Sequence, residues 1–381
     1  MSMATGKNKK ESAGKVSIDQ LRELLNKKSG REVSFDLQED NPTEVNDWIS
    51  TGSRWLDSII CRGKLAGIPV GKVTELAGLE GSGKSYMAAQ IAANAQKMGI
   101  DVIYFDSESA IDPEFLTKAG CDISKVLYTQ AESVEFVLES IEDLLKNNQN
   151  RMLFIWDSMA LTPSKTDLEG DFDPQSSMAV KPRILAKGLS KLIQPIANSQ
   201  STLLILNQLK TNLQVQNIKY ATDSERYTTP GGKALSYSYS LRVWLTGRKA
   251  KDSYVIDERG YKIGSEVKAR LEKSRFGTAG RECLFKIMWG GSVGVLDNES
   301  IFEAIKPFIK QMGAWYELDV AGTPKKFQQS GWEELMSKDE AFKKAVLDIM
   351  DREVIVKFDT REGDAKNYYN IEGEEAEENL N

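Results

Sequence analysis

The chain has 381 residues, of which 40% are hydrophobic and 28% charged, a composition typical of a globular protein. It contains no histidine, which excludes imidazole-based catalysis and argues against a zinc site. No apolar run is long enough to cross a bilayer, and residues 1–15 lack the apolar core of a signal peptide. The cysteines Cys61, Cys121 and Cys283 have no metal-ligand spacing, so we predict a cytoplasmic protein with reduced thiols.

A short amphipathic helix is predicted near the N-terminus. Ser17 can cap it, and Gln20 occupies the capping-box position. Leu21, Leu24 and Leu25 fall on one face. The segment is too small to form a domain, so we expect it to dock on an adjacent subunit.

Apolar strand-like runs alternate with helical segments from about residue 51. The runs are Val73–Gly78, Val102–Glu108, Met152–Ser158 and Thr202–Gln208. The helical segments are Lys84–Lys97, Val134–Leu145 and Pro182–Ala197. This alternation predicts an α/β fold with a mostly parallel central sheet covered by helices on both faces. Later strand candidates without intervening helices are Leu241–Leu245, Val267–Lys273 and Cys283–Trp289, and they predict a mixed or antiparallel extension of the sheet.

A phosphate-binding motif, GLEGSGKS, follows the first apolar run and opens a helical segment. Its glycines let backbone N–H groups face phosphate oxygens, and the helix N-terminus adds its positive dipole end. Lys84 is expected to reach the β- and γ-phosphates, and the Ser85 hydroxyl to bind Mg²⁺. The alternative is a glycine-rich turn with an exposed lysine. The predicted ATP-binding residues here are Gly78, Leu79, Glu80, Gly81, Ser82, Gly83, Lys84, Ser85 and Tyr86.

Polar residues end three further strand-like runs. Asp157 stands where a carboxylate holds Mg²⁺ in P-loop proteins, although Asp157 and the following serine could instead cap the next helix. Glu108 can polarise the attacking water, an assignment that is weak by itself. Gln208 can contact a γ-phosphate. If the sheet is parallel, these strand ends meet at one edge.

At this point the sequence resembles the RecA recombinases. The blocks that carry the resemblance are ISTGSRWLD, GLEGSGKS, YFDSESAIDP, WDSMALTP, LEGDF, LILNQLK, TTPGGKAL and KQMGAWYE, in the family's order, over residues 49–316. The KSR form and the acidic tail look more like phage recombinases, whereas the LTP, LEG and TTPGGKAL blocks look bacterial.

The resemblance implies roles for individual residues. Glu108 is similar to the catalytic glutamate, Asp157 to the aspartate that binds Mg²⁺, and Gln208 to the glutamine that links the γ-phosphate to a DNA-binding loop. Asp112 and Phe115 fall where the family contacts adenine, and Gly290 joins the ATP-binding set. Phe115 replaces a more usual tyrosine but keeps the ring face for stacking.

Two long polar stretches, residues 163–178 and 209–230, are uncommon without a function. In the family they are the loops that line the DNA axis. The alternative is that both stretches are flexible surface connectors without a binding function. The predicted DNA contacts and hinge residues are Lys165, Met178, Arg183, Lys210, Lys219, Arg226, Gly231 and Gly232. Such cations read phosphates, so binding should be largely independent of sequence. Asp171 and Asp173 add negative charge to the first stretch.

Lys273 and Arg275 lie two residues apart on a predicted strand. The residues alone favour a solvated strand face. By resemblance, the pair reaches across to the ATP of the neighbouring subunit and stabilises charge on the transferring phosphoryl group.

The C-terminal part is predicted to form a small α/β lobe followed by an acidic tail. Beyond Ser300 the segments are short and amphipathic with little strand signal. Residues 351–381 contain ten acidic and four basic residues, which accounts for the net charge of −6. We expect a disordered tail that either improves solubility or competes with nucleic acid. The predicted divisions are 1–50, a core at 51–298, a lobe at 299–358 and a tail at 359–381.

The sequence therefore predicts an ATP- and Mg²⁺-dependent recombinase that forms a helical homo-oligomeric filament on single-stranded DNA. Its expected role is homologous pairing and strand exchange with duplex DNA in DNA repair and the SOS response, in the cytoplasm of a bacterium or a phage-infected host. Single-strand-binding and mediator proteins are further expected partners. The alternatives are a hexameric helicase-type ATPase and a non-catalytic, ATP-gated binding module.

Overall fold

The computed structural model describes residues 16–30, 32–38, 44–109, 111–170, 180–215, 220–247, 253–290 and 293–357. The chain forms two units, Met1–Glu44 and Val45–Asn381. The predicted boundaries at 50, 298 and 358 stay predictions, and the acidic tail lies outside the described residues. Within the described residues, no helix is both long and apolar enough to span a bilayer.

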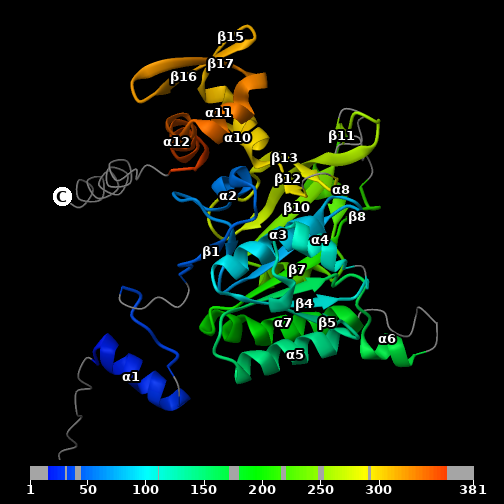
Figure 1. Ribbon diagram of the computed structural model, residues 1–381. Helices are drawn as coiled ribbons and strands as arrows, with labels where there is room; N and C mark the ends of the chain where they lie inside the picture. Colours follow the sequence, from blue (N-terminus) through cyan, green and yellow to red (C-terminus); the bar gives the residue numbers. More distant parts are fainter. Residues whose placement is uncertain are drawn as a thin grey trace, which may run out of the picture. The chain divides into compact units, whose positions relative to one another are not determined.

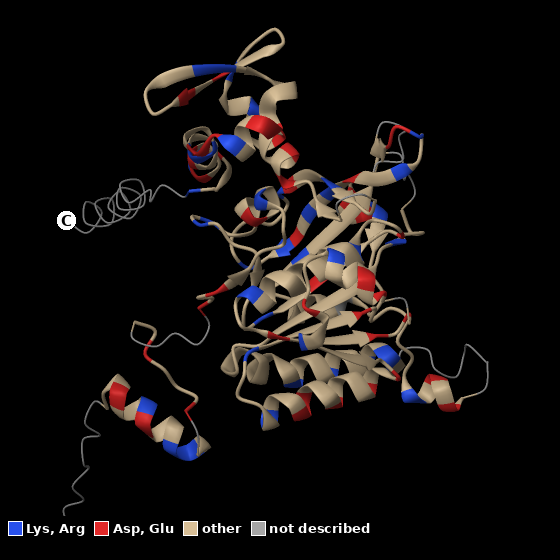
Figure 2. Cartoon of the chain, viewed as in Figure 1, with Lys and Arg blue, Asp and Glu red and all other residues tan. Residues whose placement is uncertain are grey.

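The first unit contains the predicted N-terminal helix, α1 (Ile18–Ser29). The capping box is present: Ser17 Oγ accepts from the Gln20 amide at 3.2 Å, and Gln20 Oε1 accepts from the Ser17 amide at 3.0 Å. Acidic and basic side chains alternate along the helix (Figure 2). No residue of α1 is buried, and Leu24 is 62% exposed, so its apolar face has no cover within this unit.

The second unit is built on a ten-stranded sheet in the order β14-β13-β12-β10-β3-β7-β6-β4-β5, with β11 paired to β12 (Figure 1). The six strands from β10 to β5 are parallel. This was predicted for β3, β7, β6 and β4, whereas the run that forms β10 was assigned to the mixed or antiparallel extension. These parallel strands are β10 (Leu241–Gly247), β3 (Val73–Gly78), β7 (Thr202–Gln208), β6 (Met152–Asp157), β4 (Asp101–Asp106) and β5 (Val126–Gln130). The edge strand β5 was not predicted, because most of its side chains are exposed.

The remaining strands of the sheet run antiparallel, which confirms the predicted extension. They are β11 (Tyr254–Ile256), β12 (Lys262–Ser274), β13 (Glu282–Met288) and β14 (Gly294–Val295). A separate two-stranded ribbon pairs β1 (Trp48–Ile49) with β2 (Ile68–Pro69).

Helices cover both faces of the sheet. The long helices α5 (Val134–Asn147) and α7 (Val180–Asn198) lie side by side on one face (Figure 1). The helix α3 (Lys84–Lys97) packs on the other face with α2 (Arg54–Ile60). Shorter helices are α4 (Pro113–Lys118), α6 (Lys165–Glu169), α8 (Asp223–Arg226) and α9 (Lys233–Ser238), with a 3-10 turn at Ile123–Lys125.

Alternating residues of the parallel strands fill two cores, because successive side chains of a strand point to opposite faces. Ile155 and Leu204 pack with α3, whereas Phe154, Trp156 and Leu203 pack with α5 and α7. All five side chains are fully buried. Both faces of β6 are covered, which explains why every residue of this strand before Asp157 is apolar.

A small C-terminal lobe follows the sheet. It combines helices with an antiparallel sheet of three strands, so the predicted α/β lobe is present although its individual strands gave little signal in the sequence. The aromatic rings of Phe302, Tyr316, Phe327 and Trp332 contact one another in its core. The elements of the lobe are α10 (Asp297–Ile305), a 3-10 turn at Lys306–Phe308, β15 (Lys310–Met312), β16 (Trp315–Val320), β17 (Thr323–Gln328), a 3-10 turn at Gln329–Gly331, α11 (Trp332–Lys338), α12 (Glu340–Ile349) and a π-helical turn at Met350–Val354.

Polar contacts fix the lobe to α2. Asp297 accepts from the backbone N–H of Arg54 at 2.7 Å, and the Arg54 guanidinium forms an ion pair with Asp351 at 3.0 Å. Arg281 donates to the carbonyl of Val354 at 2.8 Å. The lobe is therefore joined to the core through both ends of its sequence.

Asp57 is a buried carboxylate on α2, in the block ISTGSRWLD. It accepts hydrogen bonds from Ser50 Oγ at 2.6 Å, Thr51 Oγ1 at 2.7 Å and the Thr51 amide at 3.0 Å. Burial raises the pKa of Asp57 to about 7, although these hydrogen bonds act in the opposite direction.

The raised pKa makes stability depend on pH. The folded state holds the Asp57 proton more tightly than the unfolded chain, so the contribution of this proton is present below the unfolded pKa and is lost as the pH rises toward 7. Relative to Asp57→Asn, the free energy of unfolding of the wild type should fall by about 1.4 kcal/mol per pH unit in this window. Urea unfolding of both proteins across the window measures the slope, with Asp101→Asn, an exposed position, as control. Equal slopes for wild type and Asp57→Asn would contradict the assignment.

Candidate functional site

The carboxyl ends of the parallel strands meet at one edge of the sheet, as predicted. Gly78 of β3 pairs with Gln208 of β7, and Asp106 of β4 pairs with Asp157 of β6. On the other side of β3, Leu245 pairs with Gly78. Residues far apart in sequence are thereby placed level with the start of the phosphate-binding motif.

The motif forms a tight loop between β3 and α3. Gly81 and Gly83 have positive φ angles of 68° and 84°, a conformation that residues with a Cβ rarely adopt. The Leu79 amide donates to the carbonyl of Leu245 at 3.2 Å, which anchors the loop to β10. The Ser82 hydroxyl is buried and has no hydrogen-bond partner among the residues that the structure describes. Free donors around a loop of this shape fit a ligand with many acceptor oxygens.

Lys84 is the first residue of α3, and its side chain folds over the loop. The ammonium group donates to the carbonyls of Gly78 at 3.3 Å and Leu79 at 3.1 Å. Burial lowers the pKa of Lys84, while the negative charges of Asp157 and Glu108 act to raise it. A partly buried cation held between a glycine-rich loop and two carboxylates suits a polyphosphate.

Asp157 and Ser85 approach each other from different elements. The Ser85 hydroxyl donates to Asp157 Oδ2 at 3.0 Å, and the Tyr104 hydroxyl donates to the same oxygen at 2.9 Å. Burial raises the pKa of Asp157, against these hydrogen bonds. Within the described part of the chain, Asp157 forms no ion pair with a lysine or arginine. A buried carboxylate beside a hydroxyl, without a cationic partner, fits an oxygen-binding divalent cation such as Mg²⁺.

Glu108 is held near Asp157 by a hydroxyl bridge. Ser158 Oγ donates to Glu108 Oε1 at 2.9 Å, and Ser158 follows Asp157 directly. The backbone at Glu108 is fixed by Asp106, a buried carboxylate whose Oδ1 accepts from the amides of Glu108 at 2.9 Å and Ser109 at 3.0 Å. Glu108 itself is exposed, so water can reach its carboxylate.

An aromatic pair flanks the P-loop helix. Tyr86 and Phe115 pack edge to face with their centroids 4.4 Å apart, and both rings are half-buried. Asp112 caps α4 by accepting from the Glu114 amide at 2.8 Å. Gly290 lies two residues beyond the end of β13, a strand whose Ile287 Cδ1 would lie 2.4 Å from a Cβ at Gly83. The adenine-contact role of Asp112 and Phe115 and the ATP-binding role of Gly290 stay predictions.

The predicted DNA contacts of the first polar stretch that the structure describes lie on two different helices, α6 and α7. Lys165 begins α6, where its amide donates to Glu135 at 3.0 Å and its ammonium lies 3.6 Å from Glu139. Arg183 is exposed on α7. Met178, with Asp171 and Asp173, lies outside the described residues.

The second polar stretch is more ordered than a plain loop. The ribbon β8 (Lys210–Thr211) and β9 (Tyr227–Thr228) pairs its two ends, and α8 lies between them. Lys210 is exposed. Arg226 turns back on its own segment, donating to the Ala221 carbonyl at 3.0 Å. Lys219 lies outside the described residues.

The hinge prediction falls on Gly231 and Gly232, whose φ angles are 106° and 80°. A Cβ at Gly231 would approach Leu235 Cδ1 to 2.3 Å. Both positions therefore require glycine for the chain to turn from this loop into α9.

Ion pairs dock α8 on β12. Lys268 forms pairs with Asp223 at 3.0 Å and with Glu282 at 2.9 Å. The Ser224 hydroxyl donates to Glu272 at 2.7 Å. No local sequence pattern indicates this contact, because the partners are more than 40 residues apart.

Lys273 and Arg275 lie far from the P-loop of their own chain. Lys273 pairs with Arg242 near the start of β10, and the Arg275 amide donates to the Ser240 carbonyl at 3.0 Å. The side chains donate to the carbonyls of Ser236 at 2.6 Å and Tyr237 at 2.8 Å. Arg275 is thus level with Ser240, roughly 16 Å along the strand from Leu245 and the P-loop.

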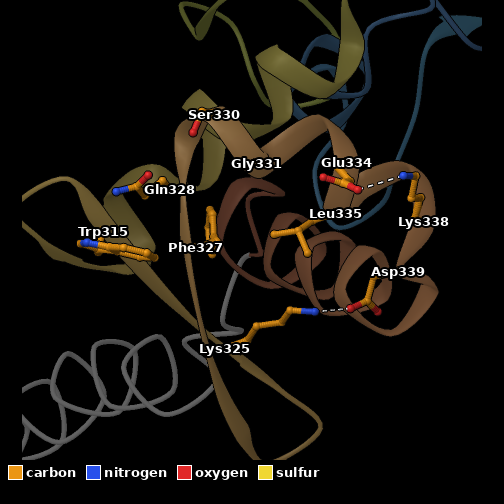
Figure 3. A pocket seen from close by; sticks show the side chains of 10 residues that line it. All are labelled: Trp315, Lys325, Phe327, Gln328, Ser330, Gly331, Glu334, Leu335, Lys338 and Asp339. Atoms are coloured by element: carbon orange, nitrogen blue, oxygen red, sulfur yellow. Dashed lines mark hydrogen bonds and ion pairs between the residues drawn. The ribbon is translucent and has the colours of Figure 1, made fainter.

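A hollow of about 450 Å³ lies in the C-terminal lobe, away from the residues of the predicted site. Figure 3 shows Trp315 and Phe327 at its wall, with ion pairs between Glu334 and Lys338 and between Lys325 and Asp339. None of its lining residues is a predicted site residue.

Several site contacts were missed from the sequence. Tyr104, Ser158 and Asp106 had no assigned role, although each is a polar residue in or next to an apolar strand. A polar side chain on a strand buried on both faces must have a partner, and this signal could have identified them.

Comparison with known proteins identifies similar sequences. The family model described as the RecA N-terminal domain matches residues 16–294. A relative named Protein RecA from Chlorobaculum tepidum is 32% identical over 326 residues, covering 85% of this chain and 88% of the relative. Protein RecA from Haemophilus ducreyi is 30% identical over 268 residues, covering 70% of this chain and 68% of the relative.

The loop geometry predicts different effects for two glycines at the ends of α3. Gly83→Ala and Gly99→Ala both place a side chain at a positive φ, which costs about 1–2 kcal/mol. Only at Gly83 does the new Cβ meet a neighbour, Ile287 Cδ1 at 2.4 Å, whereas nothing lies within 4 Å at Gly99. We expect Gly83→Ala to reduce ATP affinity at least tenfold, and Gly99→Ala to lower the melting temperature with unchanged affinity. Binding of a fluorescent ATP analogue measures this, and equal affinities in both variants would contradict the P-loop assignment.

Proposed function

Because the chain belongs to the RecA family, we propose that the strand-end cluster around Lys84 is its ATPase site and that hydrolysis there requires a second protomer. The protein is an ATP-dependent DNA recombinase of recombinational repair and a DNA-dependent ATPase. It binds ATP and single-stranded DNA and forms filaments, as the family does. None of these findings favours a hexameric helicase.

Within one protomer the residues of the P-loop edge bind and activate the substrate. The amides of Gly81 to Ser85 and the Lys84 ammonium bind the phosphates, and the aromatic pair of Tyr86 and Phe115 offers a ring face to adenine. Glu108 accepts a proton from the attacking water, whose oxygen bonds to the γ-phosphorus as the bond to the β–γ bridging oxygen breaks. Gln208, level with Gly78, responds to the γ-phosphate.

The hydroxyl of Ser85 and the carboxylate of Asp157 are the groups that hold Mg²⁺ and its waters. Their 3.0 Å contact and the lack of a lysine or arginine paired with Asp157 among the described residues support this role. Mg²⁺ supplies charge that neutralises phosphate oxygens during phosphoryl transfer. Tyr104 keeps one carboxylate oxygen oriented by donating to it at 2.9 Å.

Lys273 and Arg275 act on the ATP of a neighbouring protomer. Their distance from their own P-loop is the single observation that carries this proposal. Lys273 is level with Arg242 and Arg275 with Ser240, roughly 10 Å and 16 Å along β10 from the point where Leu245 meets Gly78. Both side chains are also directed to the carbonyls of Ser236 and Tyr237. A head-to-tail contact would place the Lys273 and Arg275 surface of one protomer against the P-loop surface of the next. Such a contact does not close into a ring, so repeating it builds a helical filament. The positive charges of Lys273 and Arg275 then stabilise the transferring phosphoryl group only in that assembly.

Exposed apolar surfaces support the same assembly. The leucines of α1 have no cover within their own unit, and the edge strand β5 exposes Leu127 by 53% and Tyr128 by 46%. Unpaired edge strands and uncovered apolar helix faces are usually covered by another chain. Both surfaces therefore serve as protomer contacts.

The two polar stretches bind DNA through backbone amides and cations. We assign this role to Lys165, Arg183, Lys210 and Arg226 among the described residues, together with Met178 and Lys219. Arg226 must leave the Ala221 carbonyl to reach a phosphate. Homology is then recognised by base pairing between the bound strand and the duplex DNA, not by the protein side chains. We also propose that the protein acts in the cytoplasm, takes part in the SOS response, and works with single-strand-binding and mediator proteins.

Electron microscopy tests the assembly. With single-stranded DNA, Mg²⁺ and a slowly hydrolysed ATP analogue, we expect long helical filaments that require both DNA and nucleotide. Lys84→Ala should lose at least 99% of ATP turnover, because loss of the main cation at the phosphates raises the barrier to hydrolysis by about 3 kcal/mol or more. Closed rings would overturn the filament proposal, and near-normal turnover in the variant would overturn the site.

Mixing two inactive variants tests the shared site. Lys84→Ala lacks a working P-loop, and the double variant Lys273→Ala/Arg275→Ala lacks the cations. If the site is shared, a mixture forms some interfaces with an intact P-loop from one variant and intact cations from the other, about a quarter of all interfaces in random filaments. DNA-dependent ATPase activity should then recover toward that fraction, whereas action within one protomer predicts no recovery.

A further inference from the structure

A buried ion pair lies beside the second polar stretch and is not used by the site described above. Glu75, in the middle of β3, is 1% exposed at its side chain, and Arg242 of β10 is 12% exposed. Arg242 Nε donates to Glu75 Oε2 at 2.5 Å. The guanidinium is flanked by the rings of Tyr239 and Trp244, each at 5.7 Å.

The pair is connected to both ends of the segment 209–230. At its start, the Asn207 amide group donates to Glu75 Oε1 at 2.9 Å, and Asn207 Oδ1 accepts from the Gln208 amide at 2.9 Å. At its end, the same amide group donates to the Pro230 carbonyl at 3.2 Å. Arg242 also donates to Thr229 Oγ1 at 2.9 Å. One buried carboxylate therefore holds the residue before Gln208 and the last two residues of the DNA-binding segment.

Stability alone is a poor explanation for this arrangement. Taking two charges out of water costs several kcal/mol per ion, and an apolar pair of similar volume is often at least as stable. Every hydrogen-bonding group of the Asn207 side chain is directed to Glu75, to Gln208 or to the loop end. The network instead fixes geometry, because each of its bonds has a defined direction.

The network also lies next to the nucleotide site. Glu75 is three residues before Gly78, and Gln208 is paired with Gly78 across the sheet. A displacement of Gln208 moves Asn207, and Asn207 holds Pro230. The two ends of the segment must then move together rather than independently.

We propose that Glu75, Arg242 and Asn207 are positioning residues that couple the nucleotide state at the P-loop to the DNA affinity of the segment 209–230. The inference rests on the proposed function, since it assumes that this segment binds DNA. It assigns no contact with ATP or DNA to the three residues. Their effect appears in the ratio of DNA affinities between two nucleotide states, which a role confined to stability would leave unchanged.

The experiment compares this ratio in matched variants of the full chain. The double variant Glu75→Gln/Arg242→Met removes both charges at once and keeps an acceptor for Asn207. Affinity for a fluorescent oligothymidylate is measured with a slowly hydrolysed ATP analogue and with ADP. We expect the affinity ratio to fall by about tenfold, while the affinity for the nucleotide itself stays within about twofold of wild type. Arg151→Met, which breaks a pair with Asp47 just before the start of β6, is the control and should keep the wild-type ratio.

A milder pair of variants decides the question if the double variant does not fold. Thr229→Val keeps the side-chain shape but removes the hydroxyl that Arg242 binds, and the ratio should fall about threefold. Thr229→Ser retains the hydroxyl and should restore it. An unchanged ratio in Thr229→Val would overturn the coupling role. A wild-type protein whose DNA affinity is the same with both nucleotides would instead show that the proposed function is wrong.

Discussion

The alignment of the parallel strand ends is the constraint on which the site depends. Gly78 is level with Leu245 on one side and Gln208 on the other, and Asp106 is level with Asp157. Side chains alternate along a strand, so a slip of one residue would turn Asp157 or Gln208 to the opposite face. The two cores prevent such a slip, because a shift would place the wrong apolar residues against α3, α5 and α7.

Buried charges in this sheet are placed where a ligand or a moving segment lies. Among the described side chains, Asp157 accepts hydrogen bonds from hydroxyls, Asp106 accepts from the backbone amides of Glu108 and Ser109 and from the Tyr128 hydroxyl, and Glu75 is paired with Arg242. Each arrangement satisfies the carboxylate differently, and the difference fits its position. Amides fix a loop, a guanidinium fixes a strand pair, and hydroxyls leave a carboxylate free to bind a cation.

The carboxyl ends and the amino ends of the parallel strands lie beside different functional groups. The P-loop end gathers Lys84 from α3, Asp157 from β6 and Glu108 from the loop after β4, whereas Lys273 and Arg275 bind carbonyls of Ser236 and Tyr237 well away from it. Under the proposed function, a single protomer holds two incomplete halves of one catalytic arrangement. The proposed dependence of hydrolysis on assembly would then follow from the direction of the strands.

Much of the fold could be predicted because its signals are local. The apolar run Met152–Asp157 and the helix Lys84–Lys97 have the bounds that were predicted or nearly so. The missed elements lack such signals: β5 is an exposed edge strand, and β17 contains a proline and two lysines. Both depend on pairing with a neighbour, which a local pattern does not report.

The sequence by itself determined the P-loop, the parallel sense of four core strands and the polar residues that end them, because glycine spacing, apolar runs and helix caps act within a few residues. Only the tertiary structure decided that Tyr104 and Ser158 orient the carboxylates, that α8 docks on Lys268, and that Glu75 and Arg242 hold Asn207 and Thr229. Those contacts join residues up to 167 positions apart. Their energies depend on burial and on the direction of each hydrogen bond, and both exist only after the sheet has closed around them.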